Sequence, residues 1–256
     1  MGVAVLAESH TSPRVVLVTG AARRVGAEIA RTLHQRGLNV AIHYRGSQQE
    51  AEQLAAQLNA HRPDSCACFA ADLLEVAQLP ALVERVVARF GRLDMLVNNA
   101  SSFYATPLGQ CDEAAWHELV GTNLKAPLFL SQAAAPWLTR LGGAIVNIVD
   151  IHAERPMPGH LIYSLAKAGL VALTKGLAGE LAPTVRVNAV APGVNLWPEH
   201  HDGFDEQARE QILAHTFLRR SGQPADLAGA VAFLLLDAPY VTGHVLNVDG
   251  GRSVYI

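Results

Sequence analysis

The sequence predicts a single α/β domain in which helices cover both faces of one parallel sheet. Short apolar runs alternate with amphipathic stretches along the 256 residues, and a glycine turn joins the first apolar run to the first helical pattern. Strands that alternate with helices form βαβ units with right-handed crossovers, so the strands are expected to be parallel. The chain contains no repeat or Pro/Gly linker, so residues 14–256 are interpreted as one domain.

Strands are expected where short runs are apolar and often β-branched. They lie near residues 15–19, 39–44, 65–71, 93–98, 144–149, 185–190 and 244–248. Helices are expected where apolar residues recur at helical spacing. They lie near residues 24–36, 47–60, 75–90, 113–139, 161–181 and 224–236.

Residues 193–222 follow the sixth strand and show no regular pattern. Open α/β sheets bind ligands at the carboxyl ends of their strands, so a substrate lid is predicted here. An insertion without a role is the alternative interpretation.

The turn after the first strand has the residues of a phosphate-binding loop. The run VVLVTGAARRVG places Gly20 directly after an apolar strand and Gly26 inside the following helical pattern, which ends at Gly37. Free backbone N–H groups and the dipole of a helix then face the loop. The motif predicts a dinucleotide site in a Rossmann-type doubly wound sheet, although a plain βα turn would also fit the pattern.

Tyr163 and Lys167 form the second chemical motif. They stand four residues apart in LIYSLAKAGLVALTK, which is just over one turn of a helix, so both side chains project from one face. A fixed cation stabilises the phenolate, which predicts a lowered pKa for Tyr163 and a proton donor that works near neutral pH. A surface pair is the alternative for this motif taken alone.

Composition excludes several classes of function. Half of the residues are hydrophobic, 17% are charged and the net charge is −3, so neither disorder nor nucleic-acid binding is expected. No run approaches 18 continuous apolar residues, so no membrane association is expected. Residues 1–13 are interpreted as a flexible leader without the basic start of a signal peptide.

Cysteine and histidine usage indicates a reduced, cytoplasmic setting without a metal. The three cysteines, Cys66, Cys68 and Cys111, do not suggest a disulfide framework. His200 and His201 are adjacent, but they have no suitably spaced acidic or cysteine partners, so a solvated loop is preferred to a metal site.

Taken in order, these motifs resemble the short-chain dehydrogenase/reductase family. Further matches are Asp72 after the third strand, the NNA sequence at residues 98–100, Asn123, and the pair Pro192–Gly193. The resemblance covers residues 14–252. It implies a seven-stranded Rossmann-type sheet, a nicotinamide cofactor, and an adenine contact at Asp72.

The end of the second strand predicts NADPH as the cofactor in preference to NADH. The run NVAIHYRGS lacks the Asp or Glu that would hold a ribose 2′-hydroxyl, and Arg45 stands there with His43 and Ser47 close by. A guanidinium can hold a 2′-phosphate through paired hydrogen bonds. The alternative is that Arg45 is a solvated surface residue.

Two departures from the common family pattern point to a polar, planar substrate. Arg24 replaces the middle glycine of the turn, and from there it could reach the pyrophosphate and a substrate beside the nicotinamide. Ser101 replaces a glycine after NNA, and Phe103 follows. An aromatic ring there could sandwich a flat heterocycle against the nicotinamide, although Phe103 could also be a core residue.

The third departure is Asp150, which occupies the position of the usual serine 13 residues before Tyr163. An ionised carboxylate cannot donate a hydrogen bond to a carbonyl, but it can accept one from an amino group or a ring N–H. Asp150 therefore favours a nitrogen heterocycle over a simple ketone. A cap of the following turn is the alternative role.

Together, TGAARRVG, HYRGS, NNASSF, Asp150 and YSLAK resemble the pteridine reductases and the related short-chain dihydromonapterin and dihydrofolate reductases. The resemblance implies that Asp150, Tyr163, Lys167 and Asn123 are catalytic. It implies a substrate site of Arg24, Ser101, Phe103, Asp150, Tyr163 and Trp197. The implied cofactor site is Gly20, Arg23, Arg24, Val25, Gly26, His43, Tyr44, Arg45, Ser47, Asp72, Leu73, Asn98, Ala100, Ser101, Tyr163, Lys167, Pro192 and Gly193. Asn98 would order the floor of the pocket, and Asn123 would order a water next to Lys167.

The expected activity is therefore NADPH-dependent reduction of a pterin or folate, with Tyr163 and Asp150 supplying the proton. A carbonyl reductase acting on 3-oxoacyl thioesters, quinones or sugars is the first alternative, and a non-catalytic NADPH-binding regulator is the second. A homotetramer is expected, because Ala- and Leu-rich helices such as 161–181 commonly pair across a two-fold axis in such enzymes. Arg252 is expected to pack near a neighbour's pocket.

Overall fold

The strands form one parallel sheet, as predicted. The computed structural model describes residues 12–197 and 205–254, and its seven-stranded sheet has the order β3-β2-β1-β4-β5-β6-β7. The strands are β1 (Val15–Val18), β2 (Asn39–Tyr44), β3 (Cys66–Ala70), β4 (Met95–Asn98), β5 (Ala144–Ile148), β6 (Arg186–Pro192) and β7 (Val245–Val248). Most of the predicted leader, and residues 198–204 of the predicted lid with His200 and His201, lie outside the described residues.

The order of the strands reverses between β1 and β4. Val18 pairs with Ile42 on one side and with Val97 on the other, so the chain leaves β1 and β4 in opposite lateral directions. A crevice forms at such a switch point, outside the carboxyl ends of the strands. The glycine turn after β1 and the NNA sequence at the end of β4 therefore meet at the same edge.

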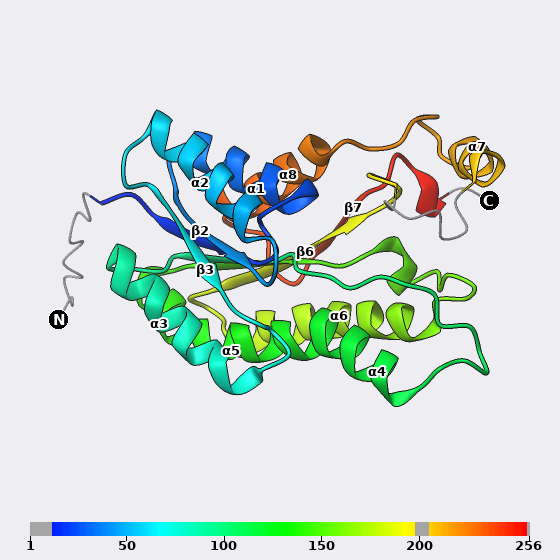
Figure 1. Cartoon of the computed structure of the whole chain (residues 1–256), viewed down its shortest axis with the longest axis horizontal. Helices are drawn as coiled ribbons and strands as arrows, with labels where there is room; N and C mark the ends of the chain where they lie inside the picture. The colour runs from blue at the N-terminus through cyan, green and yellow to red at the C-terminus, as the bar shows by residue number, and fades with distance from the viewer. Residues whose placement is uncertain (1–11, 198–204, 255–256) are drawn as a thin grey trace.

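The helices cover both faces of the sheet (Figure 1). One face carries α1 (Arg24–Gln35), α2 (Gln48–His61) and α8 (Pro224–Ala232). The other carries α3 (Leu79–Phe90), α4 (Glu113–Val120), α5 (Ala126–Leu141) and α6 (Leu161–Glu180). The shorter α7 (Glu206–Ala214) lies beyond the carboxyl end of the sheet.

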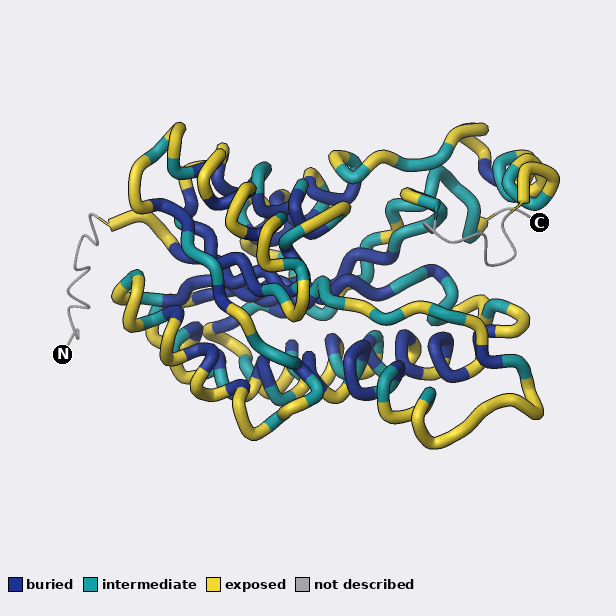
Figure 2. Tube along the Cα trace, in the orientation of Figure 1, coloured by how far each residue is buried: buried dark blue, intermediate teal, exposed yellow. Residues whose placement is uncertain are grey.

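The core consists of two apolar layers, one on each face of the sheet. Val16 and Val18 pack into the layer under α1 and α8, whereas Val15 and Leu17 pack into the layer under α3 and α5. All four of these β1 residues are fully buried, which explains why the strand is apolar throughout and does not alternate. Figure 2 shows the buried sheet between the exposed outer sides of the helices.

Two expectations about the helices were incomplete. The predicted helix 113–139 is interrupted by a π-helical turn at Gly121–Lys125, and this turn carries Asn123. Helix α7 was missed within residues 193–222, because it has no buried residue and so no apolar stripe to read. Its start does carry a recognisable signal, since the side chain of Asp205 accepts a hydrogen bond from the N–H of Ala208.

Within the described residues, one helix is long and apolar enough to cross a membrane by length and composition, namely α6. Its inner side is buried in this protein, including Tyr163, Lys167 and Leu170. That packing is expected for the core helix of a globular domain.

Candidate active site

The glycine turn packs closely against the end of β4. A Cβ atom at Gly26 would lie 2.2 Å from the carbonyl oxygen of Gly20 and 2.6 Å from Nδ2 of Asn99. Gly20 has a φ of +60°, and a Cβ atom there would lie 3.0 Å from Cα of Ala100. Only glycine permits this combination of backbone angle and close approach.

Asn99 and Thr19 hold the turn in place. Nδ2 of Asn99 donates to the carbonyl oxygens of Thr19 at 2.8 Å and Gly20 at 3.2 Å. The hydroxyl oxygen of Thr19 accepts from the backbone N–H groups of Asn99 and Ala100. Asn99 was not among the predicted site residues. The signal that could have found it is strand alternation, which turns its side chain away from that of Asn98.

His43 supports the turn from behind. Its Nδ1 accepts from the N–H of Gly20 at 3.1 Å, and its Nε2 lies 3.2 Å from the carbonyl oxygen of Ala71. These partners assign a neutral ring with the proton on Nε2. Burial lowers the pKa of His43 to about 4. Both ring nitrogens of His43 are occupied by backbone groups, so the side chain supports the shape of the turn. Because the ring is neutral, it adds no positive charge that could attract a phosphate.

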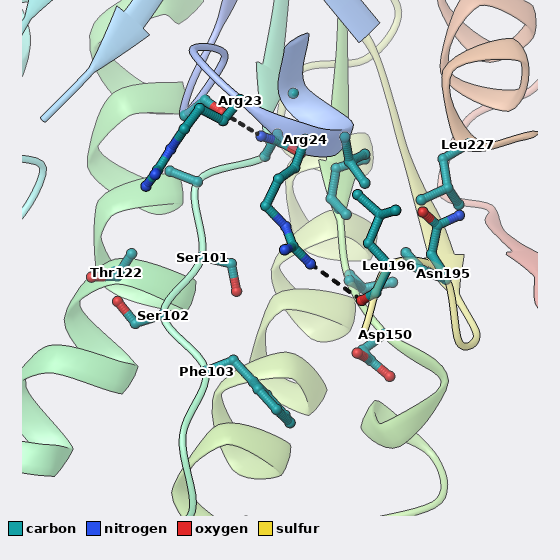
Figure 3. A pocket seen from close by; sticks show the side chains of 18 of the residues that line it. Arg23, Arg24, Ser101, Ser102, Phe103, Thr122, Asp150, Asn195, Leu196 and Leu227 are labelled. Carbon is teal, nitrogen blue, oxygen red and sulfur yellow. Dashed lines mark hydrogen bonds between the residues drawn. The ribbon is translucent and has the colours of Figure 1, made fainter. Parts of the chain in front are cut away.

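A cavity of about 1100 Å³ opens at the carboxyl edge of the sheet. The predicted residues that line it are Gly20, Arg23, Arg24, Val25, Gly26, His43, Tyr44, Arg45, Ser47, Asp72, Leu73, Ala100, Ser101, Phe103, Asp150, Tyr163, Lys167, Pro192, Gly193 and Trp197. Lining residues that sequence reasoning missed include Glu50, Asn99, Ser102, Thr122, His152 and Asn195. Figure 3 shows Ser101, Phe103 and Asp150 around the part of the cavity below the guanidinium of Arg24.

Two predicted residues, Asn98 and Asn123, lie one layer behind the cavity wall. Nδ2 of Asn98 donates to Oδ1 of Asn147 at 2.8 Å, which links β4 to β5. Asn98 thus supports the floor, as expected, but its side chain is buried.

Asn123 fixes the loop that carries Ser101 and Ser102. Its Oδ1 accepts from the hydroxyl of Ser101 at 2.6 Å, and its Nδ2 donates to the carbonyl oxygens of Ser102 and Leu119 at 2.9 Å each. The π-helical turn that carries Asn123 is a feature often found at functional sites. The water that was expected between Asn123 and Lys167 stays a prediction.

Asp150 and Tyr163 form a direct hydrogen bond. The hydroxyl of Tyr163, on the first turn of α6, donates to Oδ2 of Asp150 at 2.7 Å. Oδ1 of Asp150 accepts from the backbone N–H of His152 at 2.9 Å. One oxygen of Asp150 therefore caps the following turn and the other contacts the tyrosine, and the catalytic role of Asp150 stays a prediction.

The expectation of a lowered tyrosine pKa was wrong for the structure without ligands. Burial raises the pKa of Tyr163 well above its usual value, and the negative charge of Asp150 raises it further. Nζ of Lys167 lies 5.6 Å from the centre of the tyrosine ring and donates to the carbonyl oxygen of Ile148 at 2.9 Å. Burial lowers the pKa of Lys167 to about 8, against the opposing effect of Asp150. Burial and the carboxylate in direct contact therefore set the direction of the shift in the pKa of Tyr163.

Phe103 lies at the surface of the cavity and is 36% exposed, so it is not a core residue. One face of its ring stacks on His160, with 4.7 Å between centroids and 12° between planes. Its ring also meets that of Tyr163 at 83°. These two contacts hold the phenyl ring beside the Asp150–Tyr163 pair.

Arg24 connects the glycine turn to the segment after β6. It has a φ of 54°, and its Nη2 donates to the carbonyl oxygens of Leu196 and Trp197 at 3.2 Å each. The positive φ explains why glycine is usual here. Arg252 lines the cavity of its own chain, and its contact with a neighbour's pocket stays a prediction.

The lining has features that suit a dinucleotide. Within residues 12–197 and 205–254, no group of three His, Cys, Asp or Glu side chains could hold a metal ion. The missing Cβ atoms let the turn at Gly20 and Gly26 pack tightly against the end of β4, and α1 begins at Arg24, which lines the cavity. These features suit a pyrophosphate.

Comparison with known proteins gives matches over almost the whole chain. Residues 20–253 match the protein family described as enoyl-(acyl carrier protein) reductase. A 3-oxoacyl-(acyl-carrier-protein) reductase, FabG, of Staphylococcus aureus is 39% identical over 238 residues, covering 92% of this chain and 96% of that protein. Pteridine reductase 1 of Leishmania tarentolae is 37% identical over 287 residues, covering 96% of this chain and 98% of that protein.

Proposed function

Because the chain belongs to the short-chain dehydrogenase/reductase family of oxidoreductases, we propose that it transfers hydride from NADPH to a pterin of the biopterin, dihydropterin or dihydrofolate type. The observation that carries the proposal is the 2.7 Å hydrogen bond from Tyr163 to Asp150 at the wall of the cavity. A carboxylate at this position suits the N–H and amino groups of a nitrogen heterocycle, which can donate to it.

Phe103 supports a flat substrate. Its ring lies beside the Asp150–Tyr163 pair, and its stacking on His160 fixes the plane of the ring. An aromatic heterocycle gains from offset stacking on such a preorganised surface.

Other residues of the cavity wall would hold the cofactor, which supplies the hydride. The turn at Gly20 and Gly26 would bind the pyrophosphate, Asp72 would accept from the adenine amino group, and Lys167 would hold the nicotinamide ribose. Arg45 lies at the end of β2 and would bind the 2′-phosphate.

Reduction of a C=N bond requires one proton on nitrogen for each hydride on carbon. Tyr163 supplies that proton, which leaves a phenolate beside the carboxylate of Asp150. Tyr163 must therefore regain a proton from solvent before the next turnover. Lys167, which is charged below a pKa of about 8, stabilises the charge on the pair. General acid catalysis of this kind contributes roughly 10²–10⁴-fold.

A 3-oxoacyl reductase is the second candidate, and the similarity to the S. aureus reductase supports it as strongly as the L. tarentolae relative supports the first. A carbonyl substrate would gain from a second hydrogen-bond donor at position 150 beside Tyr163, and an ionised aspartate is not one. A panel of biopterin, dihydrofolate and a 3-oxoacyl thioester, followed by NADPH absorbance, separates the two. Turnover of the thioester alone would remove the pterin assignment.

We also propose that the chain forms a homotetramer. Trp116 on α4 and Leu165 on α6 are 52% and 51% exposed, although both are large apolar side chains. Pairing these helices across a two-fold axis would bury them. Light scattering coupled to size-exclusion chromatography tests this, and a monomer at micromolar concentration would contradict it.

A further inference from the structure

The adenosine end of the cavity, which is formed by Tyr44–Ser47, Asp72 and the adjoining glycine turn, contains two arginines that each already have a carboxylate partner. Nη1 of Arg23 lies 3.7 Å from Oε1 of Glu50, and Nη1 of Arg45 lies 3.5 Å from Oε1 of Glu118. Neither glutamate belongs to the motif at the end of β2: Glu50 stands in the next helix, and Glu118 is 73 residues beyond Arg45.

The two carboxylates come from different elements and are held differently. Glu50 stands in the first turn of α2 and lines the cavity itself. Glu118 stands near the end of α4, and its Oε1 also accepts from the hydroxyl of Ser102 at 2.6 Å. That bond fixes Glu118, whereas the side chain of Arg45 is 56% exposed and has room to turn toward a ligand.

A 2′-phosphate carries a charge of about −1.5 to −2 at neutral pH, as a phosphate monoester does. It is attracted by Arg23 and Arg45, and it is repelled by the carboxylate beside each of them. We propose that Glu50 and Glu118 are specificity-determining residues that offset these arginines and thereby limit the preference for NADPH over NADH. This inference rests on the proposed use of NADPH.

The size of the effect follows from charge and distance. One carboxylate about 7 Å from a phosphate dianion, in a dielectric close to that of water, weakens binding by roughly fivefold. NADH lacks the phosphate, so its affinity should change less than about twofold. Added salt should reduce the difference, because the charges are near solvent.

The test compares the dissociation constants of NADPH and NADH for Glu50→Gln and Glu118→Gln, without substrate, at low and high salt. Glutamine keeps an acceptor for Ser102 and removes only the charge. Glu52→Gln on α2 and Glu113→Gln on α4 are matched controls, because both glutamates are exposed and neither lines the cavity. We expect tighter NADPH binding by about fivefold in the first two variants and parental values in the controls.

Equal shifts for both cofactors, or weaker NADPH binding in Glu118→Gln, would overturn the inference. Arg45→Ala, measured in parallel, distinguishes a failure of the inference about the glutamates from a failure of the proposed use of NADPH. A loss of NADPH preference in Arg45→Ala with unchanged glutamate variants would remove only the role of the carboxylates. An unchanged preference in Arg45→Ala would place the 2′-phosphate elsewhere and remove both.

Discussion

The hydroxyl of Tyr163 donates to Oδ2 of Asp150 at 2.7 Å, across 13 residues that connect the end of β5 to the first turn of α6. The bond joins the phenol to a carboxylate that is fixed at its other oxygen by the N–H of His152. Burial raises the pKa of the phenol and the charge of Asp150 raises it further, so Tyr163 keeps its proton near neutral pH. In the proposed reaction, this proton is the one that passes to the substrate.

Replacing Asp150 should separate the two candidate reactions. In Asp150→Ser, the carboxylate is exchanged for a donor, so we expect pterin reduction to fall at least about 100-fold and a trace of carbonyl reduction to emerge. Steady-state rates on both substrate classes measure this. Asp150→Asn keeps the shape of the side chain and removes its charge, and we expect this control variant to lose pterin reduction as well. Parental pterin kinetics in either variant would end the assignment of Asp150.

Removing the phenolic hydroxyl should leave binding intact. In Tyr163→Phe the ring still packs against Phe103, and the hydroxyl is lost with its hydrogen bonds to Asp150 and Ser101. We expect turnover to fall at least tenfold, toward the roughly 10²–10⁴-fold typical of general acid catalysis. Calorimetric titration with NADPH should give the parental dissociation constant. A variant that retains full turnover would exclude the tyrosine as the proton donor.

The fold could be predicted from the sequence because its signals are local. β1 is apolar throughout since both of its faces are covered, and Gly20 and Gly26 mark a turn that other residues would obstruct. The π-helical turn at Gly121–Lys125 could not be predicted in the same way, because one inserted residue hardly alters apolar spacing over a long helix. Helix α7 has no buried stripe, so only its Asp205 cap signals it.

The site was predicted where chemistry follows from motif position, as for Asp150, Tyr163 and Phe103. It was missed where contacts join distant parts of the chain. Glu118 reaches Arg45 over 73 residues, and no spacing rule connects them. The sign of the tyrosine pKa shift was missed for a related reason. The sequence gives the distance along a helix from Tyr163 to Lys167, but it does not give the degree of burial.

The buried ammonium of Lys167 should leave a pH-dependent signature in stability. Its pKa is about 8 in the folded protein, against 10.5 in the unfolded chain. Between these values the unfolded state binds more protons, so the free energy of unfolding rises with pH across this window. A pKa shift of this size corresponds to a change of roughly 3 kcal/mol in the free energy of unfolding across the window.

Urea unfolding from pH 7 to 10.5 measures that signature against Lys167→Met, which cannot titrate. We expect the variant to be more stable than the parent below pH 8 and its advantage to shrink as the pH approaches 10.5. Lys175→Met, at an exposed position of the same helix, should give a constant difference. Parallel curves for Lys167→Met would show that the ammonium is not destabilised by burial.

The glycine turn gives the most local test of the cofactor site. A Cβ atom at Gly26 would stand 2.2 Å from the carbonyl oxygen of Gly20, so Gly26→Ala must displace the turn. We expect a loss of roughly 1–3 kcal/mol in the free energy of unfolding, as for overpacked sites. NADPH binding should weaken by at least about tenfold, because backbone donors moved by even a fraction of an ångström no longer align with a phosphate.

Gly46→Ala is the matched control for Gly26→Ala. Gly46 lines the same cavity, but a Cβ atom there meets nothing within 4 Å. The free energy of unfolding of Gly46→Ala should therefore differ from that of the parent by less than about 0.5 kcal/mol. Thermal denaturation and NADPH titration of the two variants measure this difference. They distinguish the effect of the close contact at Gly26 from the effect of adding a methyl group, which both variants share. If both variants behaved alike, the close contact between Gly20 and Gly26 would not be what shapes the phosphate site.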